Sequence, residues 1–194
     1  MAAPQLILAS GSPRRRELLD QIGVRYQIVA ADIDETPFPH EAPDALALRL
    51  AREKAQWVWQ QSDKTLPVLG ADTHGVLDGQ WLMKPKDEAD ACAMLLRMSG
   101  RSHDIYSAVV LCFEDSCLGA LSRSRVWFRH MQEAEIAAYW ASGEPRDKAG
   151  AYAIQGLGAV FVERLEGSYS GVMGLPLFET ANLLKQFGLS IGSR

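Results

Sequence analysis

The sequence predicts a fold of the α/β or α+β class, built around a mixed β-sheet. Short apolar runs typical of strands alternate along the chain with longer amphipathic segments typical of helices. An Asp-Gly step between apolar residues also predicts that one pair of strands is antiparallel. With 194 residues and no internal repeat, low-complexity segment or linker, the chain suits one domain or two closely packed lobes.

The first third of the chain is expected to contain two strands and two helices. Leu6–Ala9 is a short apolar run of the kind found in buried strands. Ser12 and Pro13 then mark the start of a helix, because serine is a preferred N-cap and proline suits the first helical position. That helix stops at Gly23. A strand, a proline-rich loop and an amphipathic helix follow over residues 24–29, 34–43 and 44–61.

The remaining two thirds show the same signals. An apolar run over residues 66–71 predicts a strand that presents Asp72 and Thr73 at its end. Asp78-Gly79 then predicts a tight hairpin. The later strands are expected over residues 105–113, 122–128 and 160–165. The later helices are expected over residues 87–98, 133–141 and 176–187.

The composition excludes several classes of protein. The net charge is −4, with a pI near 5.6, so we expect no binding to nucleic acid. A mean hydropathy of −0.09 and the lack of a long uncharged apolar run predict no membrane span. Basic residues follow the N-terminal apolar run, the reverse of a secretory signal, so we expect a cytoplasmic protein.

The cysteines and the common nucleotide motifs add only exclusions. Cys92, Cys112 and Cys117 are few and odd in number, and they predict no disulfide framework and no structural or redox role. The sequence contains no CxxC or HExxH pattern for zinc, and neither a P-loop nor a Rossmann glycine motif.

The first candidate site is the segment Ser10-Gly11-Ser12-Pro13-Arg14-Arg15-Arg16. The N-terminus of a helix carries a partial positive charge, so three arginines there cost stability unless an anion binds. Two serines, backbone amides and guanidinium groups are suited to a polyphosphate. A solvated basic helix start that binds nothing is an equally good interpretation of this segment alone.

The second candidate is Asp72, which follows an apolar strand with small residues. Small residues let a backbone or a ligand approach closely, and a carboxylate there can hold Mg²⁺ or orient a water. A strand-ending aspartate that caps a turn is the simpler alternative.

The third candidate is the glycine-rich segment 143–156. Its apolar residues alternate with small or polar ones, which predicts a packed segment that presents Gln155 to a base edge. A plain surface turn is the alternative. Glu35, Lys54 and Lys84, each considered alone, are best interpreted as solvated surface charges.

Taken together, five segments resemble the Maf family of nucleoside triphosphate pyrophosphatases, in the order and spacing of that family. The resemblance covers about residues 6–184, and the combination is highly specific. The segments are LILASGSPRRRELL, LGADT, the Lys84-Pro85 step, SGEPRDKAGAYAIQG and GSYSGVMGLPLFET.

This resemblance implies a two-lobed α/β fold like that of Maf and ITPase proteins, with a long mixed sheet, flanking helices and a central nucleotide-binding cleft within one domain over residues 1–194. It implies hydrolysis of the α–β phosphate bond of a nucleoside triphosphate with a divalent metal, Mg or Mn, and a homodimer. Asp72 would be the catalytic acid–base residue and, with Glu35, would bind the metal. Substrate choice would depend on Arg14, Thr73 and Gln155. Phosphates would be bound by Ser10, Ser12, Arg15, Lys54 and Lys84.

Thr73 and Gln155 resemble the residues at these positions in the subgroup that acts on dTTP and UTP. One alternative function is that of the 7-methyl-GTP pyrophosphatase subgroup. A second alternative is a nucleotide-binding regulator of cell division and septum formation. Ala153 departs from the family pattern, where glycine is usual, and would be strained only at positive φ. His74-Gly75 replaces the usual apolar residues, and Gly75 is expected to loosen this strand.

Overall fold

The computed structural model describes residues 3–192, which divide into two compact units. Unit 1 comprises the chain up to Thr73, residues 106–122, and the chain from Gly174 onward; unit 2 comprises residues 74–105 and 123–173. The mixed α/β class is confirmed, with a seven-stranded sheet in the order β2-β1-β3-β5-β6-β7 and β4 paired to β3. The expected cleft stays a prediction, and each unit is described by itself below.

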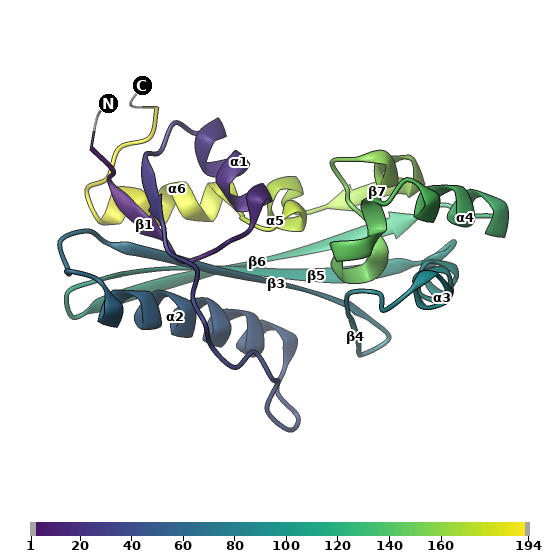
Figure 1. Ribbon diagram of the computed structural model, residues 1–194, viewed down its shortest axis with the longest axis horizontal. Coiled ribbons are helices and arrows are strands. Elements are labelled where there is room, and N and C mark those ends of the chain that lie inside the picture. Colours follow the sequence, from purple (N-terminus) through teal and green to yellow (C-terminus); the bar gives the residue numbers. More distant parts are fainter. Residues whose placement is uncertain (1–2, 193–194) are drawn as a thin grey trace. The chain divides into compact units, whose positions relative to one another are not determined.

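Unit 1 holds a parallel part of the sheet with helices on both faces. Strand β1 pairs in parallel with β2 on one side and with β3 on the other. In Figure 1, α2 covers one face of this part of the sheet, and α1 and α6 cover the other. The elements are β1 (Leu6–Leu8), α1 (Pro13–Gln21), β2 (Tyr26–Ile28), α2 (Pro43–Gln61), the first part of β3 (Val68–Leu77) and α6 (Leu177–Gln186).

The apolar side of α2 forms much of the core of unit 1. Ala47, Ala51, Ala55 and Val58 are fully buried and pack against apolar residues of β1, β3 and β5. Small side chains on this helix let its backbone lie close to the sheet. The predicted amphipathic helix is therefore confirmed, with Pro43 as its first residue.

A long hairpin joins β5 (Ser102–Phe113) to β6 (Ser116–Phe128). The expected start of β6, at residue 122, was wrong by six residues, because a two-residue turn at Glu114-Asp115 lets pairing resume at once. Glu114 has a φ of 51°, the left-handed backbone that such a turn needs.

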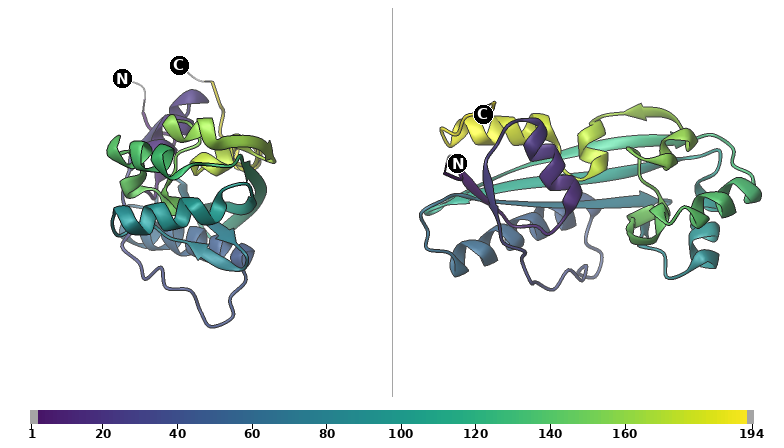
Figure 2. Two further views of the ribbon diagram at one scale, coloured as in Figure 1. Left: turned by 90° about the vertical axis from the view of Figure 1, so that its right-hand side faces the viewer. Right: turned by 45° about the horizontal axis from the view of Figure 1, so that its top comes forward.

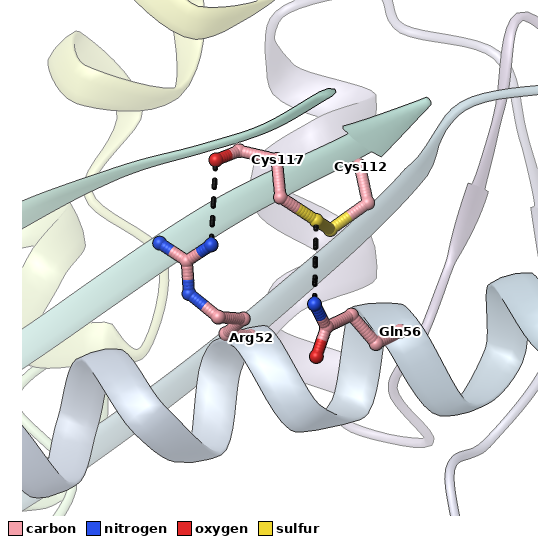
Figure 3. Close-up of a disulfide and its surroundings, with 4 residues drawn as sticks. All are labelled: Arg52, Gln56, Cys112 and Cys117. Atoms are coloured by element: carbon pink, nitrogen blue, oxygen red, sulfur yellow. Dashed lines mark hydrogen bonds between the residues drawn. A yellow bond between two sulfur atoms is a disulfide. The ribbon is translucent and has the colours of Figure 1, made fainter. Parts of the chain in front are cut away.

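This hairpin also corrects the expectation for the cysteines. Cys112 and Cys117 form a disulfide, with their Cα atoms 4.1 Å apart (Figure 3). Cys92 keeps a free thiol. A count of cysteines does not contain this information, since the turn length is what places the two residues opposite each other. From α2, Arg52 donates a hydrogen bond to the Cys117 carbonyl.

Unit 2 combines the rest of these strands with α3 and α4, which lie side by side (Figure 2). Its core is rich in aromatic side chains, among them Phe128, Tyr152 and Phe161. The Asp78-Gly79 hairpin is confirmed, with φ of 52° and 73°. The further elements are β4 (Gln80–Leu82), α3 (Glu88–Met98), α4 (Glu133–Ala141), β7 (Val162–Glu166) and α5 (Tyr169–Met173).

Three details of unit 2 differ from expectation. Residues 144–147, 149–151 and 157–161 form short 3₁₀ helices, so strand β7 begins two residues later than predicted. Helix α5 was not predicted, because its five residues are too few for a periodic pattern.

Among residues 3–192, no helix has both the length and the apolar character that crossing a bilayer requires.

Candidate active site

A buried lysine in unit 1 forms ion pairs with two carboxylates. The Nζ atom of Lys54 is 2.6 Å from Oδ1 of Asp72 and 2.6 Å from Oε1 of Glu35. The side chains of Lys54 and Asp72 are only 9% and 5% exposed, whereas that of Glu35 is 56% exposed. A charge of this kind stays buried only when it is paired. The interpretation of Lys54 as a solvated surface charge was therefore wrong, whereas Glu35 is an exposed charge that pairs with it.

Gly70 explains how Lys54 reaches Asp72. A Cβ atom at position 70 would lie 2.1 Å from the carbonyl oxygen of Ala51 and 2.9 Å from the amide nitrogen of Ala55. Only glycine therefore lets the α2 backbone lie this close to β3. The predicted close approach beside Asp72 is confirmed, and the approaching group is the helix that carries Lys54.

The position of Asp72 within its strand differs from the prediction. Strand β3 does not end at residue 71 but continues to Leu77, so that Asp72 lies in the middle of a ten-residue strand. The hairpin with β4 extends the pairing beyond the aspartate. Asp72 therefore does not cap a turn at a strand end.

The N-terminus of α1 brings the first predicted segment together. Ser12 is the N-cap, Pro13 follows, and the first turn carries no acidic residue. The Ser10 hydroxyl accepts hydrogen bonds from the Ser12 amide, at 3.2 Å, and from Nη1 of Arg15, at 2.9 Å. Burial lowers the pKa of Arg15, and the charge of Asp72 opposes this effect. Arg14 lies on the same turn and is half-buried.

A chain of hydrogen bonds orients Thr73 and connects it to the same region. The buried Ser107 hydroxyl donates to Oγ1 of Thr73 at 3.0 Å, and Thr73 donates to the Gly174 carbonyl at 3.4 Å. Nε of Arg15 donates to that same carbonyl at 2.9 Å. The Gly174 carbonyl thus accepts hydrogen bonds from Arg15, of the predicted phosphate-binding segment, and from Thr73, one of the residues expected to determine substrate choice.

Lys84 and Gln155 belong to unit 2, and both are exposed within it. The amide of Gly150 donates to the carbonyl of Met83, which attaches the segment carrying Lys84 to the glycine-rich segment. Residues 151–154 are all buried and Gln155 is exposed after them, so the predicted packing of this segment is confirmed, while the contact of Gln155 with a base stays a prediction. The other predicted site residues, from Ser10 to Thr73, all lie in unit 1.

Neither departure from the family pattern disturbs its strand or loop. Ala153 is not among the described residues with positive φ, so its methyl group causes no backbone strain. Gly75 lies within continuous pairing, opposite Leu82. A Cβ atom at Gly75 would lie 3.0 Å from Leu82 and 3.2 Å from Ile105. Gly75 therefore permits close packing and does not loosen the strand.

Sequence reasoning missed Ser107 and Gly174. A serine inside an apolar strand carries no signal of function, because its role depends on which residue lies opposite. Gly174 lies within one of the segments that carry the family resemblance, and its φ of 128° is one that other residues rarely adopt.

Comparisons with known proteins show which proteins this chain is similar to. The Maf-like protein family matches residues 5–187. A dTTP/UTP pyrophosphatase of Methylobacillus flagellatus is 52% identical over 188 residues, which cover 96% of this chain and 94% of that protein. One from Hahella chejuensis is 51% identical over 191 residues, covering 97% and 95% of the two chains.

A third dTTP/UTP pyrophosphatase, from Alkalilimnicola ehrlichii, is 52% identical over 189 residues, covering 95% and 93% of the two chains. A solved nucleoside-triphosphatase / dITP/XTP pyrophosphatase of Mycobacterium abscessus is more distant, with 18% identity and a TM-score of 0.40 over 63% of this chain and 72% of that chain. Because the family match spans nearly every described residue and relatives at about half identity align end to end, this chain belongs to the Maf family.

Proposed function

We propose that this protein hydrolyses the α–β phosphate bond of dTTP and UTP, giving the nucleoside monophosphate and pyrophosphate. The observation that carries the proposal is the cluster of the buried Asp72 and Lys54 with the more exposed Glu35, which lies in the same unit as the proposed phosphate-binding segment. The names of the relatives, which share about half of its residues, supply the two substrates.

Asp72 is the residue proposed to activate water. Its carboxylate is held in place by Lys54, and it accepts a proton from a water that attacks the α-phosphorus in line with the departing pyrophosphate. The bond between the α-phosphorus and the bridging oxygen breaks, and pyrophosphate leaves with the bond electrons. Positioning and charge neutralisation supply most of the rate enhancement for such a leaving group.

The phosphates are proposed to bind at the N-terminus of α1. The backbone amides of the first turn, the Ser10 and Ser12 hydroxyls and the Arg15 guanidinium are donors suited to phosphate oxygens. The ammonium groups of Lys54 and Lys84 are proposed to neutralise the triphosphate.

The carboxylates of Glu35 and Asp72 fit a divalent metal, Mg²⁺ or Mn²⁺. They converge on one cation in this structure, the Lys54 ammonium, and their oxygens are the donors that such metals prefer. Histidine, cysteine and acidic side chains do not gather in groups of three within residues 3–192. Magnesium is commonly held by one or two carboxylates together with substrate phosphates, so two suffice here. When bound, the metal would neutralise charge on the pyrophosphate leaving group.

Arg14, Thr73 and Gln155 are proposed to select the base, as the resemblance to the family implies. The hydroxyl of Thr73 is oriented by Ser107 and Gly174, and Gln155 presents its amide from a packed segment. A single domain around a central cleft, a homodimer, a cytoplasmic location, and the absence of nucleic-acid and membrane partners stay predictions.

A panel of nucleoside triphosphates with Mg²⁺ or Mn²⁺ tests the proposal. The panel contains dTTP, UTP, the purine nucleotides and 7-methyl-GTP, and pyrophosphate and orthophosphate release are scored separately. We expect pyrophosphate from dTTP and UTP. Cleavage of 7-methyl-GTP alone would contradict the substrate assignment but not the reaction. Nucleotide binding without any release would favour the nucleotide-binding regulator.

A further inference from the structure

Gln155 is an exposed side chain in a segment whose preceding residues are buried. Its position relative to the rest of unit 2 therefore depends on how the backbone on each side of it is held. Ala153 precedes it, and Leu157 and Gly158 follow it. The hydrogen bonds of these three backbone amides all lead to two side chains, Tyr139 and Glu144.

Glu144 and Tyr139 hold this segment on both sides of Gln155. Oε2 of Glu144 accepts a hydrogen bond from the Leu157 amide at 2.9 Å, and Oε1 accepts one from the Gly158 amide at 3.0 Å. Oε1 also accepts from the Tyr139 hydroxyl at 2.6 Å. The Tyr139 oxygen in turn accepts from the buried Ala153 amide at 3.1 Å.

The glycines of the segment make room for these two groups. A Cβ atom at Gly156 would lie 2.1 Å from Oε2 of Glu144, and one at Gly158 would lie 2.6 Å from the Tyr139 hydroxyl oxygen. The φ of Gly156 is −112°, which any residue adopts, so glycine is needed here for space rather than for its backbone freedom. Both glycines therefore serve the contact with Tyr139 and Glu144.

The charge of Glu144 suits this role. Burial alone would raise its pKa, but the hydrogen bonds from Tyr139 and from the amides of Gly158 and Leu157 outweigh burial and hold the pKa of Glu144 below its ordinary value. Hydrogen bonds from amides to an ionised carboxylate are stronger than those to a neutral acceptor.

We propose that Glu144, supported by Tyr139, is a positioning residue for Gln155 and thereby a determinant of base selectivity. In this role, Glu144 does not contact the substrate. It fixes the backbone on each side of Gln155, so that the amide of that side chain meets a pyrimidine in one orientation. The proposal rests on the proposed function, in which Gln155 contacts the base.

The test compares base selectivity across four variants and the wild type. The variants are E144Q, Y139F, Q155A and the double variant E144Q/Q155A. For each, kcat and KM are measured with dTTP, UTP, dCTP and dATP. In E144Q the new amide group donates where a backbone amide must also donate, so one hydrogen bond is lost while side-chain size is kept. E133Q makes the same change at an exposed position at the start of α4 and is the matched control.

We expect E144Q to reduce the preference for dTTP over dATP by about tenfold, mainly through KM, because a lost hydrogen bond to the Glu144 carboxylate loosens the backbone beside Gln155. We expect Q155A to have a similar effect. The double variant should lose no more selectivity than either single variant, since both act through one contact. Y139F should give a smaller loss of the same kind, and it provides the test if E144Q does not fold. E133Q should match the wild type.

A merely structural role would lower kcat/KM by one factor for every nucleotide, and that result would overturn the proposal. Additive losses of selectivity in the double variant would overturn it too. The preference for dTTP over dATP is also measured without turnover, as the ratio of the dissociation constants of the α,β-methylene analogues of the two nucleotides. Failure of the proposed hydrolysis is therefore distinguishable from failure of this inference. Equal binding of both analogues by the wild type would overturn the inference.

Discussion

The Nζ atom of Lys54 and the Oδ1 atom of Asp72 lie 2.6 Å apart, although they come from a helix and a strand that are separated in the chain. Both side chains are buried, and Lys54 has a second partner in the more exposed Glu35. Removing Asp72 and removing Lys54 therefore have unequal consequences. Loss of Asp72 leaves Lys54 with Glu35, whereas loss of Lys54 removes the cation that contacts the buried Asp72 carboxylate directly.

The substitution D72N is expected to keep the fold and to lower kcat by about 10²–10⁴-fold, because an amide cannot accept the proton from water. Pyrophosphate release from dTTP measures the rate, and circular dichroism checks the fold. The control is D115N, in the exposed turn between β5 and β6. Full activity of D72N would remove Asp72 from the proposed role.

The substitution K54M is expected to lower the free energy of unfolding by about 3–5 kcal/mol, since it removes the ammonium group that contacts the buried Asp72 carboxylate directly. Urea unfolding at neutral pH measures the loss. D72N should cost less, because the Glu35–Lys54 pair remains. A K54M protein as stable as the wild type would show that this ion pair contributes little.

The buried His103 is expected to make stability depend on pH. Desolvation lowers the pKa of His103 to about 4, while nearby Asp104 has the opposite effect. As the pH falls, the unfolded chain binds a proton at His103 near pH 6.5, before the folded protein does. The stabilisation of the folded protein by neutral His103 is therefore complete above pH 6.5 and is lost as the pH falls to 4. The loss amounts to about 3 kcal/mol.

Urea unfolding between pH 7 and pH 4 measures this dependence in the wild type and in H103Q, which keeps a hydrogen-bonding group for Tyr152 but cannot titrate. The difference between the two proteins isolates His103 from the carboxylates that titrate in the same range. H130Q changes an exposed histidine and serves as the control. Identical pH profiles for H103Q and the wild type would contradict the assignment.

Reduction of the Cys112–Cys117 disulfide is expected to lower the free energy of unfolding by about 2 kcal/mol, since the bond closes only a short loop. Urea unfolding with and without dithiothreitol measures the change. The double variant C112A/C117A should not respond to dithiothreitol, whereas C92S should respond like the wild type. A wild-type protein that is insensitive to reduction would contradict the prediction.

The sequence predicted most elements because their signals are local. Ser12-Pro13 and Gly23 bound α1, and Asp78-Gly79 forms the expected hairpin. The missed features depend on pairing across the chain. The upstream extension of β6, the disulfide and the continuation of β3 past Asp72 all follow from which strand lies opposite, and a single strand's composition does not contain that information.

The residues of the candidate site likewise fall into those that the sequence indicated and those that only the structure revealed. Charged and small residues in local patterns indicated Arg15, Asp72 and Gln155 from the sequence. The groups that orient them did not stand out, because Ser107 and Tyr139 are ordinary members of a strand and a helix. Their role follows only from the hydrogen bonds that the folded chain makes.

The glycine at position 70 has a consequence for how the charge cluster responds to a ligand. Backbone contact between α2 and β3 fixes the separation of the Lys54 and Asp72 backbones, so neither backbone can shift without moving a whole element of the core. Glu35 lies outside any helix or strand, and its side chain is the most exposed of the three. We therefore expect Glu35, rather than the two buried residues, to adapt to nucleotides of different size.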